Sequence, residues 1–294
     1  MKILITGAKG MLAKAVINQF KDNNELILTD VSELDITDEK STNEFITKVK
    51  PKYIINCAAY TAVDKAEEEV ELAEKVNSIG PKNLAVAARK NETTLIHIST
   101  DYVFNGELDI SKSYIENDEI APVTVYGKTK AEGEKNIIEN CDKYYILRTA
   151  WLYGDGNNFV RTMIKLGKEK NEVNVVNDQH GSPTYTVDLA SIINQVIEKK
   201  LPYGIYHSTN LGFTTWYDFT KKIYEIANIN CKVNPVTSEE FIRPAKRPKN
   251  SKMSKEKLLT NNVIIPEYED ALKRYIIAEK DTGMENWKWK KEKE

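Results

Sequence analysis

Short apolar runs alternate with amphipathic stretches along the first half of the chain. Five runs have the length of buried strands and cover residues 2–6, 25–29, 53–56, 94–98 and 144–148. A first helical pattern ends near residue 20, and three further ones cover residues 38–49, 70–89 and 124–140. Strands that alternate with helices build parallel sheets. The pattern therefore predicts an α/β fold with a doubly wound parallel sheet of the Rossmann type.

After Gly154 this alternation gives way to shorter, mixed elements, with a short strand expected at 173–176 and a loop at 177–184. We predict a dinucleotide-binding Rossmann domain at residues 1–154, to which later segments also contribute core strands. Residues 155–280 are expected to form a smaller, mixed α/β substrate-binding region, partly interleaved with the first. The charged stretch 281–294 is expected to be a tail.

The first apolar run leads directly into a glycine turn at the start of a helical pattern. Gly7 permits a tight turn, and Gly10 lets backbone amides approach a pyrophosphate at the positive end of the helix. Ala13 replaces the third glycine of the usual fingerprint, and a methyl group there still permits close packing. Asp30 ends the second run, where a carboxylate suits a ribose 2′-hydroxyl or simply opens a turn. This stretch predicts dinucleotide binding.

Two further strand ends carry small or hydroxyl-bearing residues. Ala58, Ala59 and Thr61 follow the third run, where a cofactor can pass close to the backbone or where small residues simply pack. Thr100 follows the fourth run, and its hydroxyl either stabilises a carbonyl oxygen that is becoming an alkoxide or caps the backbone. Ligands of doubly wound sheets collect at the carboxyl ends of strands, which favours the functional interpretation.

Tyr126 and Lys130 lie four positions apart in the helical pattern 124–140, and therefore on one face. An ammonium beside a phenol favours the phenolate, and a phenol that titrates near pH ~10 needs a shift of roughly three units to act at neutral pH. The same spacing recurs at Tyr217 and Lys221, away from any strand end, where we expect a helix surface with a snorkelling lysine. We predict that only Tyr126 and Lys130 handle protons.

The charge and composition of the chain limit the classes of partner that it is expected to bind. A net charge of −2 provides no field that attracts nucleic acid or an acidic membrane, so we expect neither partner. The three cysteines and three histidines show no ligand spacing, so no metal site is predicted. No apolar run approaches the ~20 residues of a membrane span. The expected location is a reducing cytoplasm.

Three motifs together resemble the extended short-chain dehydrogenase/reductases, and more narrowly the dTDP-4-dehydrorhamnose reductase family. They are Gly7-x-x-Gly10-x-x-Ala13, the stretch 99–104 (Ser-Thr-Asp-Tyr-Val-Phe) and Tyr126-x-x-x-Lys130. The resemblance runs from Met1 to about Ile277, with further support at 59–67, 148–151, 156–159, 177–184 and 247–251. It implies that NADH or NADPH reduces the C4 ketone of a dTDP-4-dehydro-6-deoxy sugar to give dTDP-L-rhamnose, a precursor of surface polysaccharide.

The resemblance also implies roles for individual residues. Those that would lie against the cofactor are Gly10, Met11, Leu12, Asp35, Ile36, Ala59, Tyr60 and Thr61. Tyr126 would donate the proton, and Lys130 would tune it and hold the nicotinamide ribose. The residues that would contact the sugar or its diphosphate are Thr100, Asp101, Trp151, Asn158 and Arg247, with Arg243 and Lys246 as neighbouring cations. Asp30 favours NADH, although the family accepts either cofactor.

Other members of the superfamily remain alternatives. A related epimerase or dehydratase would keep Tyr126 and Lys130, but the dehydratase pattern has Thr-Asp-Glu where this chain has Thr-Asp-Tyr at 100–102. A non-catalytic relative serves as a regulatory subunit of methionine adenosyltransferase, and retention of Thr100 with the tyrosine and lysine disfavours it. Some family members form dimers through magnesium, but the stretch 14–16 offers no carboxylate. A homodimer that needs no metal therefore remains an alternative.

Overall fold

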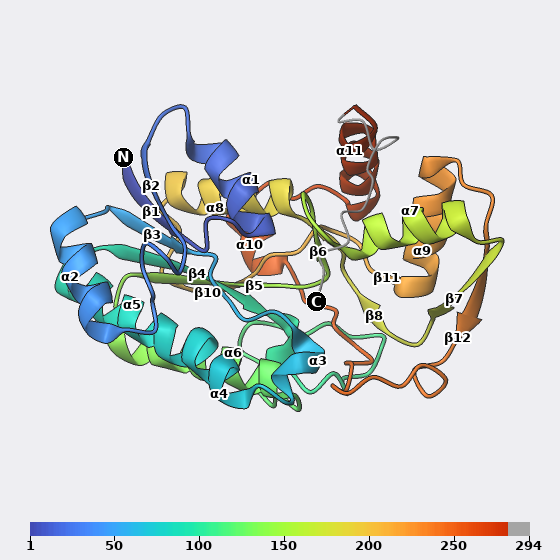
Figure 1. Cartoon of the computed structure of the whole chain (residues 1–294), viewed down its shortest axis with the longest axis horizontal. Helices are drawn as coiled ribbons and strands as arrows, with labels where there is room; N and C mark the ends of the chain where they lie inside the picture. Colours follow the sequence, from blue (N-terminus) through green and yellow to red (C-terminus); the bar gives the residue numbers. More distant parts are fainter. Residues whose placement is uncertain (282–294) are drawn as a thin grey trace.

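The computed structural model describes residues 1–281, and a six-stranded parallel sheet lies at its centre (Figure 1). In sheet order the strands are β10 (Gly204–His207), β5 (Tyr144–Thr149), β4 (Thr94–Thr100), β3 (Tyr53–Asn56), β1 (Lys2–Thr6) and β2 (Glu25–Thr29). The predicted doubly wound parallel sheet is confirmed. The strand order reverses between β1 and β3, and such a switch point opens a crevice at the carboxyl ends of the strands.

Helices cover both faces of this sheet. One face carries α1 (Met11–Phe20) and α8 (Thr186–Glu198), and the other carries α2 (Glu39–Val49), α5 (Gly80–Lys90) and α6 (Val125–Asn140) (Figure 1). Side chains of β1 alternate between the two layers: Ile3 and Ile5 join the core beneath α1 and α8, whereas Leu4 joins the opposite core. Burial of each such side chain contributes about 1.5–3 kcal/mol.

The helical pattern predicted over 70–89 is divided into three parts. They are α4 (Val70–Glu74), a π-helical turn η1 (Lys75–Ile79) and α5. A π turn widens the helix locally and often marks a functional position. Here it turns Asn77 into the interior, where the side chain is 1% exposed. Gly80 follows at once, and a Cβ there would lie 2.7 Å from the Ile36 side chain.

The second half of the chain builds a smaller lobe with its own apolar core. Its helices are α7 (Phe159–Glu169), α9 (Trp216–Ala227) and α11 (Tyr268–Asp281) (Figure 1). Short strand pairs join β7 (Glu172–Val176) to β12 (Lys232–Val236), β8 (His180–Gly181) to β11 (Thr214–Thr215), and β6 (Leu152–Tyr153) to β9 (Thr184–Tyr185). The remaining short elements are α3 (Val63–Ala66), η2 (Asp101–Val103) and α10 (Glu256–Thr260).

The chain returns from this lobe to the main sheet. β10 pairs with β5 as an edge strand, α8 packs against α1, and α10 packs against β10. Within residues 1–281, no helix is both long and apolar enough to cross a lipid bilayer. The three cysteines, Cys57, Cys141 and Cys231, are free thiols. The predicted charged tail lies, from residue 282 onward, outside the described residues.

Candidate active site

The glycine turn after β1 lies directly on the end of β3. Gly7 has a φ of +63°, and a Cβ on it would lie 2.8 Å from the backbone of Ala58, so only glycine fits there. Gly10 is the N-cap of α1, no side chain caps this helix, and its first turn holds no acidic residue. Asp30, at the end of β2, accepts the backbone N–H of Lys9 at 3.2 Å. The open amides form a cradle that fits a dinucleotide pyrophosphate.

The other residues predicted to line the cofactor differ in whether their side chains are buried or exposed. The side chain of Leu12 is buried in the core beneath α1, and that of Ile36 is buried in the opposite core, so only their backbones can face a ligand. Asp35 is exposed and accepts from the backbone N–H of Thr37 at 2.9 Å. Met11 is partly exposed beside Gly156.

The loop after β3 is held by a residue that the sequence did not single out. The Asn77 side chain accepts the backbone N–H of Tyr60 at 2.8 Å and donates to the Tyr60 carbonyl at 3.0 Å. It also donates to Thr129 Oγ1 on α6 at 3.2 Å. The loop that contains Ala59 and Thr61 is therefore fixed to the helix that carries Tyr126. The signal available in the sequence was a polar residue just before the Gly80 break in a helical pattern.

Two caps and two glycines position α6. Thr124 is its N-cap and accepts the N–H of Gly127 at 3.0 Å, while Glu67 accepts the N–H of Val125 at 3.0 Å. A Cβ on Gly127 would lie 2.2 Å from the Tyr102 carbonyl oxygen. A Cβ on Gly133 would lie 2.2 Å from a carbonyl of the π turn. The helix therefore packs against both η1 and η2 more closely than any other residue type permits.

Tyr126 meets the end of β4. Its ring contacts the Tyr102 ring edge-on, with centroids 5.4 Å apart. Burial raises the pKa of Tyr126 to about 12; a hydrogen bond with Thr100 acts in the opposite direction, and the charge of Asp101 raises the pKa further. The phenol is therefore protonated at neutral pH. It stands beside a second hydroxyl, which is an arrangement suited to proton donation.

The amine of Lys130 does not lie beside the Tyr126 phenol, where the helical spacing predicted it. Its Nζ lies 2.6 Å from the carbonyl oxygen of Ile98 and 3.1 Å from His97 Nε2, and the residue is 2% exposed. Burial lowers the pKa of Lys130 to about 8. Lys130 was predicted to lower the Tyr126 pKa; here the buried amine turns to a strand carbonyl instead of the phenol, and Lys130 is not among the groups that shift that pKa.

Asp101 differs from its predicted role as a sugar contact. It is 4% exposed; its Oδ1 accepts from Thr100 Oγ1 at 2.9 Å, and its Oδ2 accepts from the hydroxyl of Ser251. Burial raises the pKa of Asp101 to about 6, against the effect of these hydrogen bonds. The carboxylate therefore orients Thr100 and joins the end of β4 to the segment around Ser251.

One of the three cations at 243–247 reaches this site. Arg247 Nη2 lies 2.8 Å from Asp64 Oδ2, and the guanidinium hydrogen-bonds the Tyr102 phenol. Arg243 instead stacks on the Phe241 ring, and Lys246 pairs with Glu107 at the surface. Arg247 is therefore the cation that continues the row from Thr100 through Tyr126 and Tyr102.

Trp151 occupies a strained position just after β5. Its φ of +48° lies in the left-handed region, which a bulky side chain rarely adopts. The indole stacks on Trp216 with centroids 3.6 Å apart, and a Cβ on Gly181 would lie 2.7 Å from it. Contacts from α9 and β8 therefore fix the ring at the boundary between the lobes.

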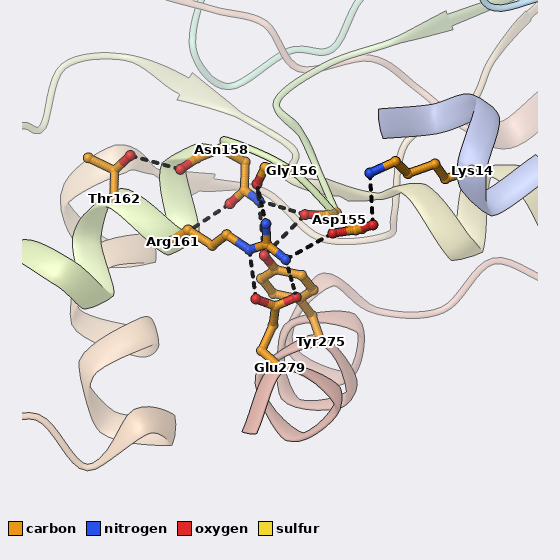
Figure 2. Close-up of polar contacts among 9 residues, drawn as sticks. Lys14, Asp155, Gly156, Asn158, Arg161, Thr162, Tyr275 and Glu279 are labelled. Atoms are coloured by element: carbon orange, nitrogen blue, oxygen red, sulfur yellow. Dashed lines mark hydrogen bonds and ion pairs between the residues drawn. The ribbon is translucent and has the colours of Figure 1, made fainter. Parts of the chain in front are cut away.

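Asn158 was predicted to bind the nucleotide diphosphate, and its side chain makes hydrogen bonds within the protein (Figure 2). It is the N-cap of α7: Oδ1 accepts the N–H of Arg161 at 3.0 Å. Its Nδ2 lies within hydrogen-bond distance of the Gly154 and Gly156 carbonyls and of Tyr275 Oη, at 2.7, 3.0 and 2.9 Å. Both ends of the amide are occupied, so Asn158 joins α7 to α11 as a structural residue.

The chain matches known proteins over almost its whole described length. The family model described as the RmlD substrate binding domain matches residues 1–280. The chain belongs to the RmlD family. The resemblance inferred from the motifs is thereby confirmed.

Three members of the RmlD family illustrate the similarity. The dTDP-4-dehydrorhamnose reductase of Aggregatibacter actinomycetemcomitans is 44% identical over 265 residues, covering 85% of this chain and 89% of the relative. The solved structure of a dTDP-4-dehydrorhamnose reductase from Clostridium acetobutylicum is 52% identical, with a TM-score of 0.92 and coverage of 95% and 100%. One from Bacillus anthracis, solved in complex with NADP, is 43% identical, with a TM-score of 0.90 and coverage of 94% and 99%.

Met11, which was predicted to lie against the cofactor, also belongs to the wall of a cavity. This cavity of about 910 Å³ opens between α1, α7 and α11, and its wall includes Lys14 and Asp155, which pair at 3.0 Å (Figure 2). Neither Thr100 nor Tyr126 lines it. Among residues 1–281, no group of three or more histidine, cysteine or acidic side chains is arranged to hold a metal ion.

Proposed function

We propose that this chain is an NAD(P)H-dependent dTDP-4-dehydrorhamnose reductase, which reduces the C4 ketone of its dTDP-sugar to give dTDP-L-rhamnose. The observation that carries the proposal is the meeting of Thr100 and Tyr126 at the carboxyl end of β4, in a chain of the RmlD family. Two relatives that share most of its length, those from Aggregatibacter actinomycetemcomitans and Clostridium acetobutylicum, are named for this reaction. The product serves as a precursor for surface polysaccharide.

Side chains of this protein stabilise the negative charge on the ketone oxygen and supply its proton. When bound, a reduced nicotinamide supplies the hydride that the ketone carbon receives. Negative charge then grows on the ketone oxygen, where Tyr126 donates its proton and the single O–H of Thr100 stabilises the charge once it turns from Asp101 Oδ1. Because the pKa of Tyr126 is raised to about 12, the phenol holds that proton at neutral pH until it is needed. Lys130, one turn further along α6, is assigned to the resulting phenolate, which its amine reaches only by leaving the Ile98 carbonyl.

The cofactor site is assigned to the glycine turn and the strand ends beside it. Gly7 and Gly10 provide the cradle, and the loop from Ala58 to Thr61 provides the second wall. Asp30 favours NADH, since a carboxylate suits a ribose hydroxyl and repels a 2′-phosphate. The Bacillus anthracis relative was solved with NADP, so both cofactors belong in the assay.

The substrate site is assigned to residues at the boundary of the lobes. Arg247 presents a guanidinium fork that suits a diphosphate, and the fixed indole of Trp151 suits a sugar face. In this arrangement residues 1–154 hold the cofactor and residues 155–280 complete the sugar-nucleotide site, with β10 returning to the first domain. We place the enzyme in the cytoplasm, where three free thiols stay reduced. No nucleic acid takes part, and a homodimer fits the proposal without being required.

The test follows oxidation of NADH or NADPH with the dTDP-4-keto sugar generated in situ. Stoichiometric cofactor loss with formation of dTDP-rhamnose is expected. Tyr126→Phe should lose about 10²–10⁴-fold in turnover while keeping its affinity for the cofactor. Tyr217→Phe is the matched control, because Tyr217 lies on α9 beneath the Lys221 ammonium and should keep full turnover. Unchanged kcat in Tyr126→Phe would overturn the assignment.

A further inference from the structure

Four buried side chains form a continuous chain of polar contacts across the centre of the sheet. Thr6 Oγ1 donates to Asn56 Oδ1 at 2.6 Å, Asn56 Nδ2 lies 2.9 Å from His97 Nδ1, and His97 Nε2 lies 3.1 Å from Lys130 Nζ. None of the four is more than 2% exposed. The chain begins on β1, crosses β3 and β4, and ends on α6. The reaction described above gives no role to Asn56 or His97.

The orientation of the Asn56 amide is fixed by a backbone donor. Its Oδ1 accepts the N–H of Ala58 at 3.2 Å as well as the Thr6 hydroxyl. Because a backbone N–H only donates, this end of the amide is the oxygen, and the Nδ2 group donates to His97 Nδ1. A neutral imidazole carries one proton, so the proton of His97 is on Nε2.

The Nε2–H of His97 faces Lys130 Nζ, and this contact suits only one protonation state of the lysine. An ammonium has donors but no acceptor, so it cannot accept this N–H. A neutral amine accepts it with its lone pair and still donates to the Ile98 carbonyl at 2.6 Å. Burial acts in the same direction, because it lowers the pKa of Lys130 to about 8 and the pKa of His97 well below its usual value.

The other ionisable groups near Lys130 either raise its pKa or leave it unchanged. Glu134, one turn further along α6, and Cys57, just after β3, both raise the pKa of Lys130. The charge of Glu134 is shared with the buried Arg148 guanidinium at 2.7 Å. Tyr126, one turn earlier, is a neutral phenol because its own pKa is raised. His97 is therefore the group whose hydrogen bond depends on the charge of Lys130.

We propose that His97 is a positioning residue for the reductase: its Nε2–H, set by Asn56, binds Lys130 as a neutral amine and so governs when Lys130, on the same helix as Tyr126, becomes an ammonium. The consequence for Tyr126 rests on the function proposed above. A solvent proton that joins Nζ takes the lone pair that His97 bonds, so the contact breaks and the ammonium turns to other acceptors. The imidazole keeps its own single proton throughout.

The tautomer is measured directly by nuclear magnetic resonance of the full chain labelled with ¹⁵N-histidine. There are only three histidines, and the spectrum of His97→Gln identifies the signals of His97 by their loss. We expect an unprotonated Nδ1 and a protonated Nε2 that do not titrate between about pH 5 and pH 9. A proton on Nδ1, or a doubly protonated ring, overturns the proposal. This readout does not depend on turnover, so an inactive enzyme would count only against the proposed function.

The pH dependence of kcat/KM tests the consequence for Lys130. Asn56→Asp replaces the amide donor by a carboxylate that accepts a proton from Nδ1, which leaves Nε2 as an acceptor for the ammonium. We expect the alkaline limb to move up by about one pH unit in Asn56→Asp and in His97→Leu. His97→Gln keeps an amide that can donate to Lys130 and should restore the wild-type limb.

Asn91→Asp is the control for the chemical change itself. Asn91 caps the C-terminal end of α5 and lies just before the amino end of β4, whereas the reaction site lies at the carboxyl end of that strand. The alkaline limb of the kcat/KM profile of Asn91→Asp should therefore coincide with that of the wild type. A limb that stays in place in both Asn56→Asp and His97→Leu, in proteins whose thermal unfolding is cooperative, overturns the proposal. If these variants do not fold, the tautomer of the unaltered chain still decides.

Discussion

Arg247 Nη2 lies 2.8 Å from Asp64 Oδ2, although 183 positions separate the two residues in the chain. The other oxygen of Asp64 accepts the backbone N–H of Ala245 at 3.2 Å. This pair fixes the basic segment near the end of the chain against α3, which follows the cofactor loop. The carboxylate therefore determines where the guanidinium can meet a diphosphate.

Asp64→Asn should raise the KM for the dTDP-sugar about tenfold and change kcat less. A charge-assisted hydrogen bond contributes about 1.5–3 kcal/mol, and tenfold corresponds to about 1.4 kcal/mol. Steady-state kinetics with saturating cofactor measure the change. Lys246→Met is the control, since that lysine pairs with Glu107 at the surface. An unchanged KM in Asp64→Asn would remove Arg247 from the substrate site.

Gly127→Ala should damage both folding and turnover. The added methyl group would lie 2.2 Å from the Tyr102 carbonyl oxygen and 3.1 Å from Pro122 Cβ, and neither atom is the free end of a flexible side chain. Overpacking of this kind costs about 1–3 kcal/mol, and relief by shifting α6 would displace Tyr126. Chemical denaturation and kcat are the measurements. Lys128→Ala, on the exposed side of the same turn, should change stability by less than about 0.5 kcal/mol; equal stability of the two variants would contradict the argument.

The sequence predicted the parts of this molecule that depend on local spacing. Periodicity predicted the sheet and its helices, and the spacing of Gly7 and Gly10 predicted the turn. It did not predict Asn77, because the role of that residue depends on a π turn and a loop 17 positions away. Nor did it predict the contact between Asp101 and Ser251, which lie 150 positions apart. Such pairs are created by tertiary folding, which a local pattern does not encode.

Lys130 and Asn158 show a second limit. Helical spacing placed Lys130 correctly on the face of Tyr126, but the direction of its amine is decided by a carbonyl and an imidazole on a neighbouring strand. Asn158 belongs to a motif that resembles a ligand-binding stretch, yet its nearest acceptors are the carbonyls of its own loop. In both cases the sequence pointed to the residue but not to its hydrogen-bond partners.

Asp101 should make stability fall as pH rises through the acid range. Its folded-state pKa is raised from 3.8 to about 6, so the folded protein binds this proton more tightly than the unfolded chain. The stabilisation is therefore complete below about pH 4, is lost between about pH 4 and pH 6, and amounts to about 3 kcal/mol at most. The measurement is the free energy of unfolding of Asp101→Asn minus that of the wild type, which should increase over this interval.

A matched control separates this effect from the other carboxyl groups. Asp142 is an exposed partner of Arg89, and exposed ion pairs contribute little to stability, so Asp142→Asn is the control for loss of a carboxylate. A difference for Asp101→Asn that falls with pH would mean that the folded protein favours the charged carboxylate. The account of Asp101 as a desolvated anchor would then be wrong.

Asn158→Ala should lower stability without weakening substrate binding. The change removes the cap of α7 and leaves the Gly154 carbonyl and the Tyr275 hydroxyl with one partner fewer (Figure 2). Loss of an N-cap costs about 0.5–2 kcal/mol, while the KM for the dTDP-sugar should stay at its wild-type value. Asn158→Asp keeps an oxygen that can cap the helix and favours its positive end, so it should recover part of the loss. A tenfold higher KM with unchanged stability in Asn158→Ala would instead return this residue to the diphosphate site, because a structural cap cannot be removed without a cost in folding.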